Sequence, residues 1–154
     1  RQRRGIRSHH SNEASHFDVR SAITIGMPAR FAPPLRIATA VMGLFFVFSV
    51  AVQYNDPDPV RWMVIYGAAA ILSLAAIRAA LPPFLPALHA GIALGWALVW
   101  LPGAVRTSFA EMFRTYEMMS PAMEEGREML GLAIVAAWMT VLAVASSRAR
   151  RTTA

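Results

Sequence analysis

Apolar and polar positions follow one another along this chain in long blocks rather than in a short alternation. Charged residues are absent from four stretches, which cover residues 37–55, 62–77, 79–105 and 129–147. A helix that crosses a bilayer needs about 20 mostly apolar residues. The pattern therefore predicts an all-α protein, an integral membrane four-helix bundle.

The ends of the spans follow from the residues that border each block. The first and fourth blocks are long enough as they stand. The second block is long enough to span a bilayer when Val60 and residues 79–81 are added to it. Arg78 then lies near the end of this span, where its side chain can snorkel to the interface. Prolines at positions 82, 83 and 86 interrupt the start of the third block, so we expect its helix over residues 84–101.

The first block has an alternative interpretation as a cleaved signal peptide, because Ser49-Val50-Ala51 is similar to a small-residue cleavage site. The apolar stretch from Ile37 to Tyr54 has 18 residues, however, whereas an ordinary signal core has roughly 7–15. We therefore favour a retained first span.

The arginines indicate how the chain is threaded. If both termini are cytoplasmic, the inner side carries six arginines from Met27 onward and the outer side carries four. The positive-inside rule favours this orientation. All 15 residues that are lysine or arginine are arginine, whose codons are GC-rich. This favours a GC-rich bacterial genome, and we therefore expect the protein in a bacterial inner membrane.

The outer connection between spans three and four, residues 102–126, is long enough to hold structure of its own. Ser108 and Glu111 have the spacing of a capping box. Apolar side chains follow helical spacing on one face: Val105, Phe109, Met112, Phe113, Tyr116 and Met119. These features predict an amphipathic outer helix that lies in the interface or covers the bundle mouth. Ser120-Pro121 is typical of the start of the fourth helix.

Small residues at every fourth position favour close helix packing in a membrane. One such stripe lies on span three, Ala87, Gly91 and Gly95, and a similar stripe of small residues lies on span two: Ala69, Ser73, Ala76 and Ala80. We expect both stripes to pack inside the bundle. The alternative is a homodimer, or a membrane-protein partner, that meets Gly91 and Gly95.

Polar side chains suited to chemistry gather in two segments, after span one and at the start of span four. Since both segments reach the outer side, we predict an outer-face polar cluster of Gln53, Asn55, Asp56, Asp58, Glu125, Arg127 and Glu128.

Structural roles explain much of this cluster. Asp58 before Pro59 is typical of a helix N-cap, and acidic residues at the start of span four favour the helix dipole. Two functional alternatives stay open. In the first, Asp56 forms an ion pair with Arg127. In the second, a hard cation such as Ca²⁺ or Mg²⁺ is bound by four carboxylates, those of Asp56, Asp58, Glu125 and Glu128.

His89 is the remaining titratable group within a span. It lies towards the inner end of span three, away from the outer acids, which weakens any metal site of histidine and carboxylates. An ionisable residue in a membrane is a functional candidate, but we favour a neutral histidine bonded to backbone or headgroup. The chain has no cysteine and no nucleophile arrangement or phosphate-binding loop, so we predict no catalytic residue, metal or cofactor.

Composition agrees with a chain solvated by lipid, since 56% of residues are hydrophobic and 16% charged, against about a quarter charged in soluble domains. The net charge of +6 would suggest a nucleic-acid partner, but removal of residues 1–26 leaves ten arginines and seven acids. We therefore expect the lipid bilayer as a partner and no nucleic acid.

Met27 is the first methionine. We accordingly expect a disordered or untranslated extension over residues 1–30, the four-span domain over 31–148 and a cytoplasmic tail over 149–154.

Two segments resemble the transmembrane protein 220 family. The first is Gln53-Tyr54-Asn55-Asp56-Pro57-Asp58-Pro59 with Trp62 and Ile65-Tyr66-Gly67, and the second is Glu124-Glu125-Gly126-Arg127-Glu128 with Gly131-Leu132. The resemblance covers about residues 36–147. It implies a small multi-span membrane protein, directs attention to the two outer segments, and supplies no catalytic residue.

Two function hypotheses follow. The first is a structural or interaction component of the membrane, in which the outer cluster holds helix ends together. The alternative is an ion-handling protein or membrane enzyme that uses the outer acids. Asp56→Asn separates them, because it lowers thermal stability under the first and abolishes a cation-dependent response under the second.

Overall fold

The structure, a computed structural model, describes residues 31–114 and 120–151. Its elements in chain order are α2 (Pro33–Val52), the 3₁₀ turn η1 (Gln53–Asn55), α3 (Pro59–Arg78), α4 (Phe84–Ala104), α5 (Phe109–Met112) and α6 (Pro121–Arg151). Four of these helices are long and apolar enough to cross a membrane. The prediction of an all-α bundle with four spans is therefore confirmed. The expected N-terminal extension and residues 152–154 of the expected tail lie outside the described residues.

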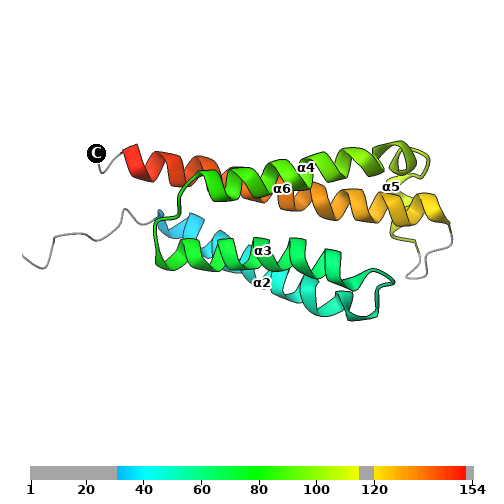
Figure 1. The fold of residues 1–154 in the computed structure, drawn as a ribbon, viewed down its shortest axis with the longest axis horizontal. Coiled ribbons are helices and arrows are strands. Elements are labelled where there is room, and N and C mark those ends of the chain that lie inside the picture. The colour runs from blue at the N-terminus through cyan, green and yellow to red at the C-terminus, as the bar shows by residue number, and fades with distance from the viewer. Residues whose placement is uncertain (1–30, 115–119, 152–154) are drawn as a thin grey trace, which may run out of the picture.

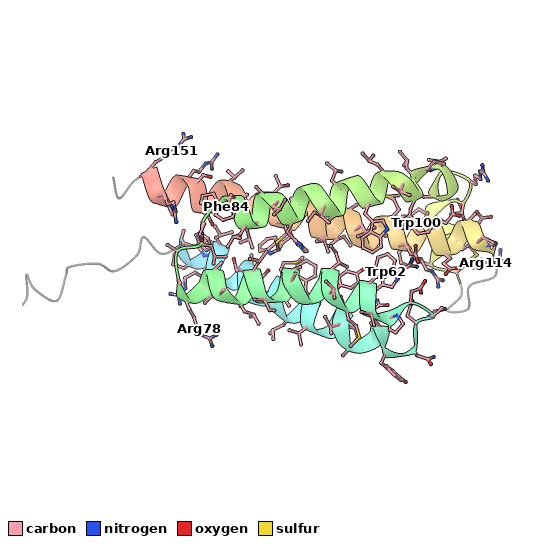
Figure 2. All side chains as sticks on the ribbon, in the orientation of Figure 1. Trp62, Arg78, Phe84, Trp100, Arg114 and Arg151 are labelled. Atoms are coloured by element: carbon pink, nitrogen blue, oxygen red, sulfur yellow. The ribbon has the colours of Figure 1, made fainter. Side chains whose placement is uncertain are left out.

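The four long helices form two antiparallel pairs, α2 with α3 and α4 with α6 (Figure 1). Contact within each pair is extensive, whereas the pairs meet mainly where α3 touches α4 and α6. Arg78 and Arg151 lie at one end of the bundle, and Arg114 lies at the other (Figure 2). We call this second end the mouth; it comprises η1, the loop to α3, the end of α4, α5 and the start of α6.

A glycine allows α2 and α3 to approach each other. A Cβ atom at Gly43 would lie 2.8 Å from Leu74 Cδ2 and 3.4 Å from Ser73 Cβ, so a larger residue would force these side chains aside. The predicted small-residue stripe is buried on α3 at Ala69, Ser73 and Ala76, as expected, whereas Ala80 lies beyond the end of this helix and is exposed.

The α4–α6 contact uses a different face of α4 from the one predicted. Ala90, Ala93 and Ala97 are buried, whereas Gly91 and Gly95 face open space with nothing within 4 Å of a Cβ atom placed there. The prediction that this glycine stripe packs inside the bundle is therefore wrong. The alanines lie on the inward side of the helix, which turns the intervening glycines outward.

Helix α4 also runs three residues past its predicted end at Leu101. Pro102 removes one backbone donor, but the helical hydrogen bonds resume after it, since the N–H of Val105 donates to the Leu101 carbonyl at 3.1 Å. The helix thereby carries Gly103 to the mouth.

Aromatic side chains fill the space between the pairs at the mouth end of the core. The ring of Trp62 on α3 stacks on Trp96 of α4 with centroids 5.0 Å apart, and Tyr66 lies beside Trp62 at 6.2 Å. Phe46 of α2 lies 6.5 Å from Tyr66. These rings connect three helices and fix the position of Trp62 and Tyr66.

Two polar contacts link the pairs deeper in the bundle. His89 Nε2 lies 3.0 Å from the Ile65 carbonyl oxygen, and the Trp138 indole N–H donates to Ser73 Oγ at 3.1 Å. Hydrogen bonds between helices are a recurrent source of stability in membranes. The expectation that His89 bonds to backbone is confirmed, and the bond joins α4 to α3.

Helix α6 is longer than a bilayer requires. Its 31 residues correspond to about 46 Å, against about 30 Å for the hydrocarbon layer. Its charged residues lie near its two ends, acidic residues and Arg127 at the mouth and arginines at the other end. The first turns of α6 therefore lie at the level of lipid headgroups, where charged side chains can reach water.

Candidate functional site at the mouth of the bundle

The turn between α2 and α3 is built around Asp56. Its carboxylate Oδ1 accepts a hydrogen bond from the backbone N–H of Asp58 at 2.9 Å. Such a bond closes a local turn, as expected for Asp before proline. Asp56 therefore has a structural role in this turn.

Asp58 occupies the N-cap position of α3 but makes no capping hydrogen bond with its side chain. Its backbone angles, φ −121° and ψ 57°, differ from the extended conformation that presents a capping side chain. The carboxylate lies instead 3.0 Å from Arg61 Nη2. The predicted cap is therefore right in position and wrong in its contact.

Arg61 connects the two pairs at the mouth. Its Nη2 atom also lies 3.6 Å from Glu128 Oε1 on α6, and the Glu128 side chain is only 13% exposed. The guanidinium further lies over the Trp62 ring, 5.3 Å from its centroid. The sequence prediction missed Arg61. The three-residue spacing from Asp58 could have suggested the first ion pair, but no sequence signal indicated the second.

A cavity of about 340 Å³ lies between the α2–α3 pair and the start of α6. Its lining residues come from both pairs: Val52, Gln53, Asp56, Trp62, Tyr66, Glu124, Arg127 and Glu128. Two buried polar atoms of this lining, Trp62 Nε1 and Glu128 Oε2, have no hydrogen-bond partner. Buried polar atoms are usually paired in folded proteins. In the part of the chain that the structure describes, Arg61 Nε, Trp100 Nε1 and Ser146 Oγ also have no partner.

The predicted cluster is only partly assembled here. Gln53, Asp56, Arg127 and Glu128 line the cavity, whereas Asn55 is exposed and does not. Glu125 points elsewhere, since a Cβ at Gly103 of α4 would overlap its carboxylate. Over residues 31–114 and 120–151, no three acidic, histidine or cysteine side chains come together as a metal-binding group. The four carboxylates considered for a hard cation therefore do not form one site.

The outer segment between α4 and α6 begins as predicted. Ser108 Oγ accepts a bond from the Glu111 N–H at 3.2 Å, and Glu111 Oε2 accepts one from the Ser108 N–H at 2.8 Å. This capping box lowers the pKa of Glu111, first through the Ser108 backbone bond and then through the Ser108 hydroxyl. The helix that it caps, α5, has only four residues.

The helix in this segment is shorter than the apolar spacing predicted, since α5 ends at Met112. Met112 is buried, whereas Phe109 and Phe113 are exposed, and the expected members Tyr116 and Met119 lie outside the described residues. The segment nevertheless covers part of α6. The Met112 carbonyl accepts a bond from Arg127 Nε at 2.7 Å, so α5 fixes one end of a cavity-lining side chain.

The start of α6 is as predicted. Ser120 Oγ accepts a hydrogen bond from the Met123 N–H at 3.3 Å, and Pro121 is the first helical residue. Gly126 in the next turn allows Met112 to approach, because a Cβ there would lie 2.6 Å from Met112 Cε. These contacts set the direction in which the acidic turns of α6 leave the bilayer.

Two distant segments of the sequence meet at the cavity. A Cβ atom at Gly131 of α6 would overlap the hydroxyl of Tyr66 on α3, so the absence of a side chain at position 131 makes room for the phenol.

A model of the family described as "Transmembrane family 220, helix" matches residues 45–144, which include both segments. The chain belongs to this family. No solved structure matches it.

Membership in transmembrane family 220 agrees with the architecture. The four apolar helices and the family match establish a multi-pass integral membrane protein whose environment is a lipid bilayer. In this member of the family, both segments that carry the resemblance lie near the mouth, and each contributes residues to the cavity lining.

Proposed function

We propose that this protein is a structural or interaction component of the membrane whose mouth holds two helix pairs in a fixed arrangement. The observation that carries the proposal is Arg61, which pairs with Asp58 beside it and with Glu128 on α6. Together with the Trp62–Trp96 stack and the His89 and Trp138 hydrogen bonds, this bridge contributes to the relative position of the two pairs. The alternative of an ion-handling protein has less support, since Asp58 and Glu125 lie against other partners.

Replacement of Arg61 tests the proposal. Arg61→Met keeps the apolar stem and leaves Glu128 as an unpaired, mostly buried carboxylate, so we expect a loss of about 1–3 kcal/mol in the free energy of unfolding. Adding Glu128→Gln should restore part of that loss. Arg106→Met is the matched control, because Arg106 is an exposed outer arginine. Equal melting temperatures for Arg61→Met and Arg106→Met in detergent would contradict the proposal.

For the orientation, we place both termini in the cytoplasm of a bacterial cell. The support is the excess of arginines at the end of the bundle that holds Arg78 and Arg151. Reporter fusions after Ala154 should be active only as cytoplasmic reporters. Activity of a periplasmic reporter at that position would reverse the orientation.

Association through Gly91 and Gly95 is the remaining part of the proposal. Both glycines face away from the bundle and leave a shallow surface that a second helix can approach, which supports a homodimer or a membrane-protein partner. Energy transfer between labelled copies in vesicles should fall when Gly95 is replaced by leucine. Unchanged transfer, with Ile71→Ala at an exposed position of α3 as control, would remove this surface from consideration.

A further inference from the structure

The cavity at the mouth has the dimensions of a ligand site. Its volume of about 340 Å³ lies in the range of roughly 300–1,000 Å³ found for small-molecule cavities. Its apolar wall consists of Val52, Trp62 and Tyr66, and its polar wall consists mainly of charged side chains from the turn and from α6. An apolar body with a few polar groups is typical of sites that bind small organic molecules.

The charges of the lining favour a cation. Three carboxylates, those of Asp56, Glu124 and Glu128, line the cavity with one guanidinium, that of Arg127. A second guanidinium, that of Arg61, lies 3.6 Å from Glu128, so carboxylates still exceed guanidinium groups. These carboxylates do not converge as a metal-binding group. Their spread around the cavity suits an organic cation with several N–H donors better than a bare metal ion, which needs all its ligands within about 2.6 Å.

The unpaired buried atoms indicate which hydrogen-bonding groups a ligand of this cavity needs. Glu128 Oε2 is an acceptor without a donor, and Trp62 Nε1 is a donor without an acceptor. Trp62 is 2% exposed, and stacking on Trp96 holds its ring in place. A ligand that satisfies both atoms needs an N–H donor for the carboxylate and an oxygen acceptor for the indole.

We propose that this cavity binds a primary ammonium ion that carries a nearby oxygen, with the ethanolamine cation as the simplest case. The ammonium group donates to Glu128, and the oxygen accepts from the Trp62 N–H. Free ethanolamine and the headgroup of phosphatidylethanolamine share this chemistry, and the mouth lies at the level of headgroups. Choline carries the same charge but has no N–H donor on its nitrogen, so it serves as the matched negative probe.

Binding is measured on the full chain in two arms. In phosphatidylcholine nanodiscs, titration calorimetry compares ethanolamine with choline. In detergent with equal amounts of phosphatidylethanolamine and phosphatidylcholine, native mass spectrometry measures which lipid stays bound. We expect a preference for the primary ammonium form in at least one arm. Binding only in the first arm assigns a soluble amine as the source, and retention only in the second assigns the lipid.

Variants connect the binding to the named atoms. Glu128→Gln removes the charge, and Trp62→Phe removes the indole N–H while keeping an aromatic ring. Each should weaken binding by roughly tenfold or more, since each deletes one hydrogen bond and the first also deletes a charge interaction. Glu111→Gln is the control, because that carboxylate lies outside the cavity and glutamine preserves the capping box.

The possible results separate clearly. Equal binding of ethanolamine and choline, together with equal retention of the two lipids, would overturn the proposal, as would unchanged affinity in both cavity variants. Because Glu128→Gln can also disturb the Arg61 bridge, the Trp62→Phe result stands alone as a test. Failure here would leave the structural role of Arg61 intact, since that role is measured by thermal unfolding.

Discussion

Replacing Gly131 with alanine should force α3 and α6 apart at the edge of the cavity. A Cβ atom at this position would overlap the Tyr66 hydroxyl, and the next nearest atom of the ring, Cζ, would lie 3.4 Å away. The phenol is held from its other sides by Trp62 and Phe46, so it has little freedom to move aside. The substitution therefore introduces a steric conflict that the core must absorb.

The expected magnitude combines two opposing effects. Overpacking costs about 1–3 kcal/mol, whereas replacing glycine with alanine inside a helix contributes about 0.5–1 kcal/mol of stability. The net loss should be about 0.5–2 kcal/mol, and about 1 kcal/mol corresponds to a change in Tm of roughly 2–4 °C for a protein of this size. Adding Tyr66→Phe removes the overlapping oxygen, so the double variant should regain most of the loss.

Thermal unfolding in detergent of the four members of this double-mutant cycle measures the coupling directly. We expect a coupling free energy of about 0.5–2 kcal/mol between the two positions. Gly67→Ala on α3 is the matched control, because the nearest atom to its new Cβ would be Val50 Cγ2 at 3.8 Å, an ordinary contact. Additive effects of Gly131→Ala and Tyr66→Phe would refute the described contact between α3 and α6.

Three further perturbations test other contacts. Ser73→Ala removes the acceptor of the Trp138 N–H and should cost about 0.5–2 kcal/mol in thermal unfolding, whereas Ser147→Ala, which breaks only a bond within α6, should cost less. Gly103→Ala should displace the Glu125 carboxylate and lower Tm, and no decrease would show that this side chain lies elsewhere. Because the pKa of Glu111 is lowered, its capping contribution to stability is complete at pH values above the ordinary carboxyl range and is lost as the pH falls through the folded-state pKa. Hydrogen-exchange protection of the α5 amides should decline over the same pH range. Protection that does not change with pH would contradict this prediction.

The spans were predictable because lipid imposes a strict rule on sequence. No water is present to hydrogen-bond exposed backbone, so every crossing segment must be helical and almost free of charge. The charge-free blocks therefore located four helices to within a few residues. At the end of α4 the difference is three residues, because one proline removes a single donor without ending the helix.

The rotation of each helix about its axis was not predictable in the same way. In a soluble bundle polar residues mark the outward face, but on α4 both the inward and the outward faces are small or apolar. Ala93 and Gly95 are both small residues, so residue type does not show which of them faces inward. Ala93 is fully buried, whereas Gly95 faces away from the bundle. Only the packing against α6 distinguishes them.

The candidate site was predictable as a region and not as a set of partners. Polar residues after span one and at the start of span four had to reach the same side of the membrane. The pairing of Arg61 with Glu128 depends on how two segments far apart in sequence approach each other, which no local pattern encodes. The place of Trp62 at the end of a span is typical of tryptophans in the membrane interface, whereas its side chain is buried in the core and stacks on Trp96.

The arrangement in two pairs has a consequence for biogenesis. Each pair consists of helices consecutive among the spans, so each can form a helical hairpin as soon as its own residues have left the ribosome. The linker at residues 79–83, with Pro82 and Pro83, separates the two hairpins and lets the first be integrated before the second is synthesised. The His89 and Trp138 hydrogen bonds and the Arg61 bridge join residues of the two hairpins, so they can form only when both hairpins are present. The cavity exists only once both hairpins are present, so a chain halted after its first hairpin inserts into the membrane without acquiring the site.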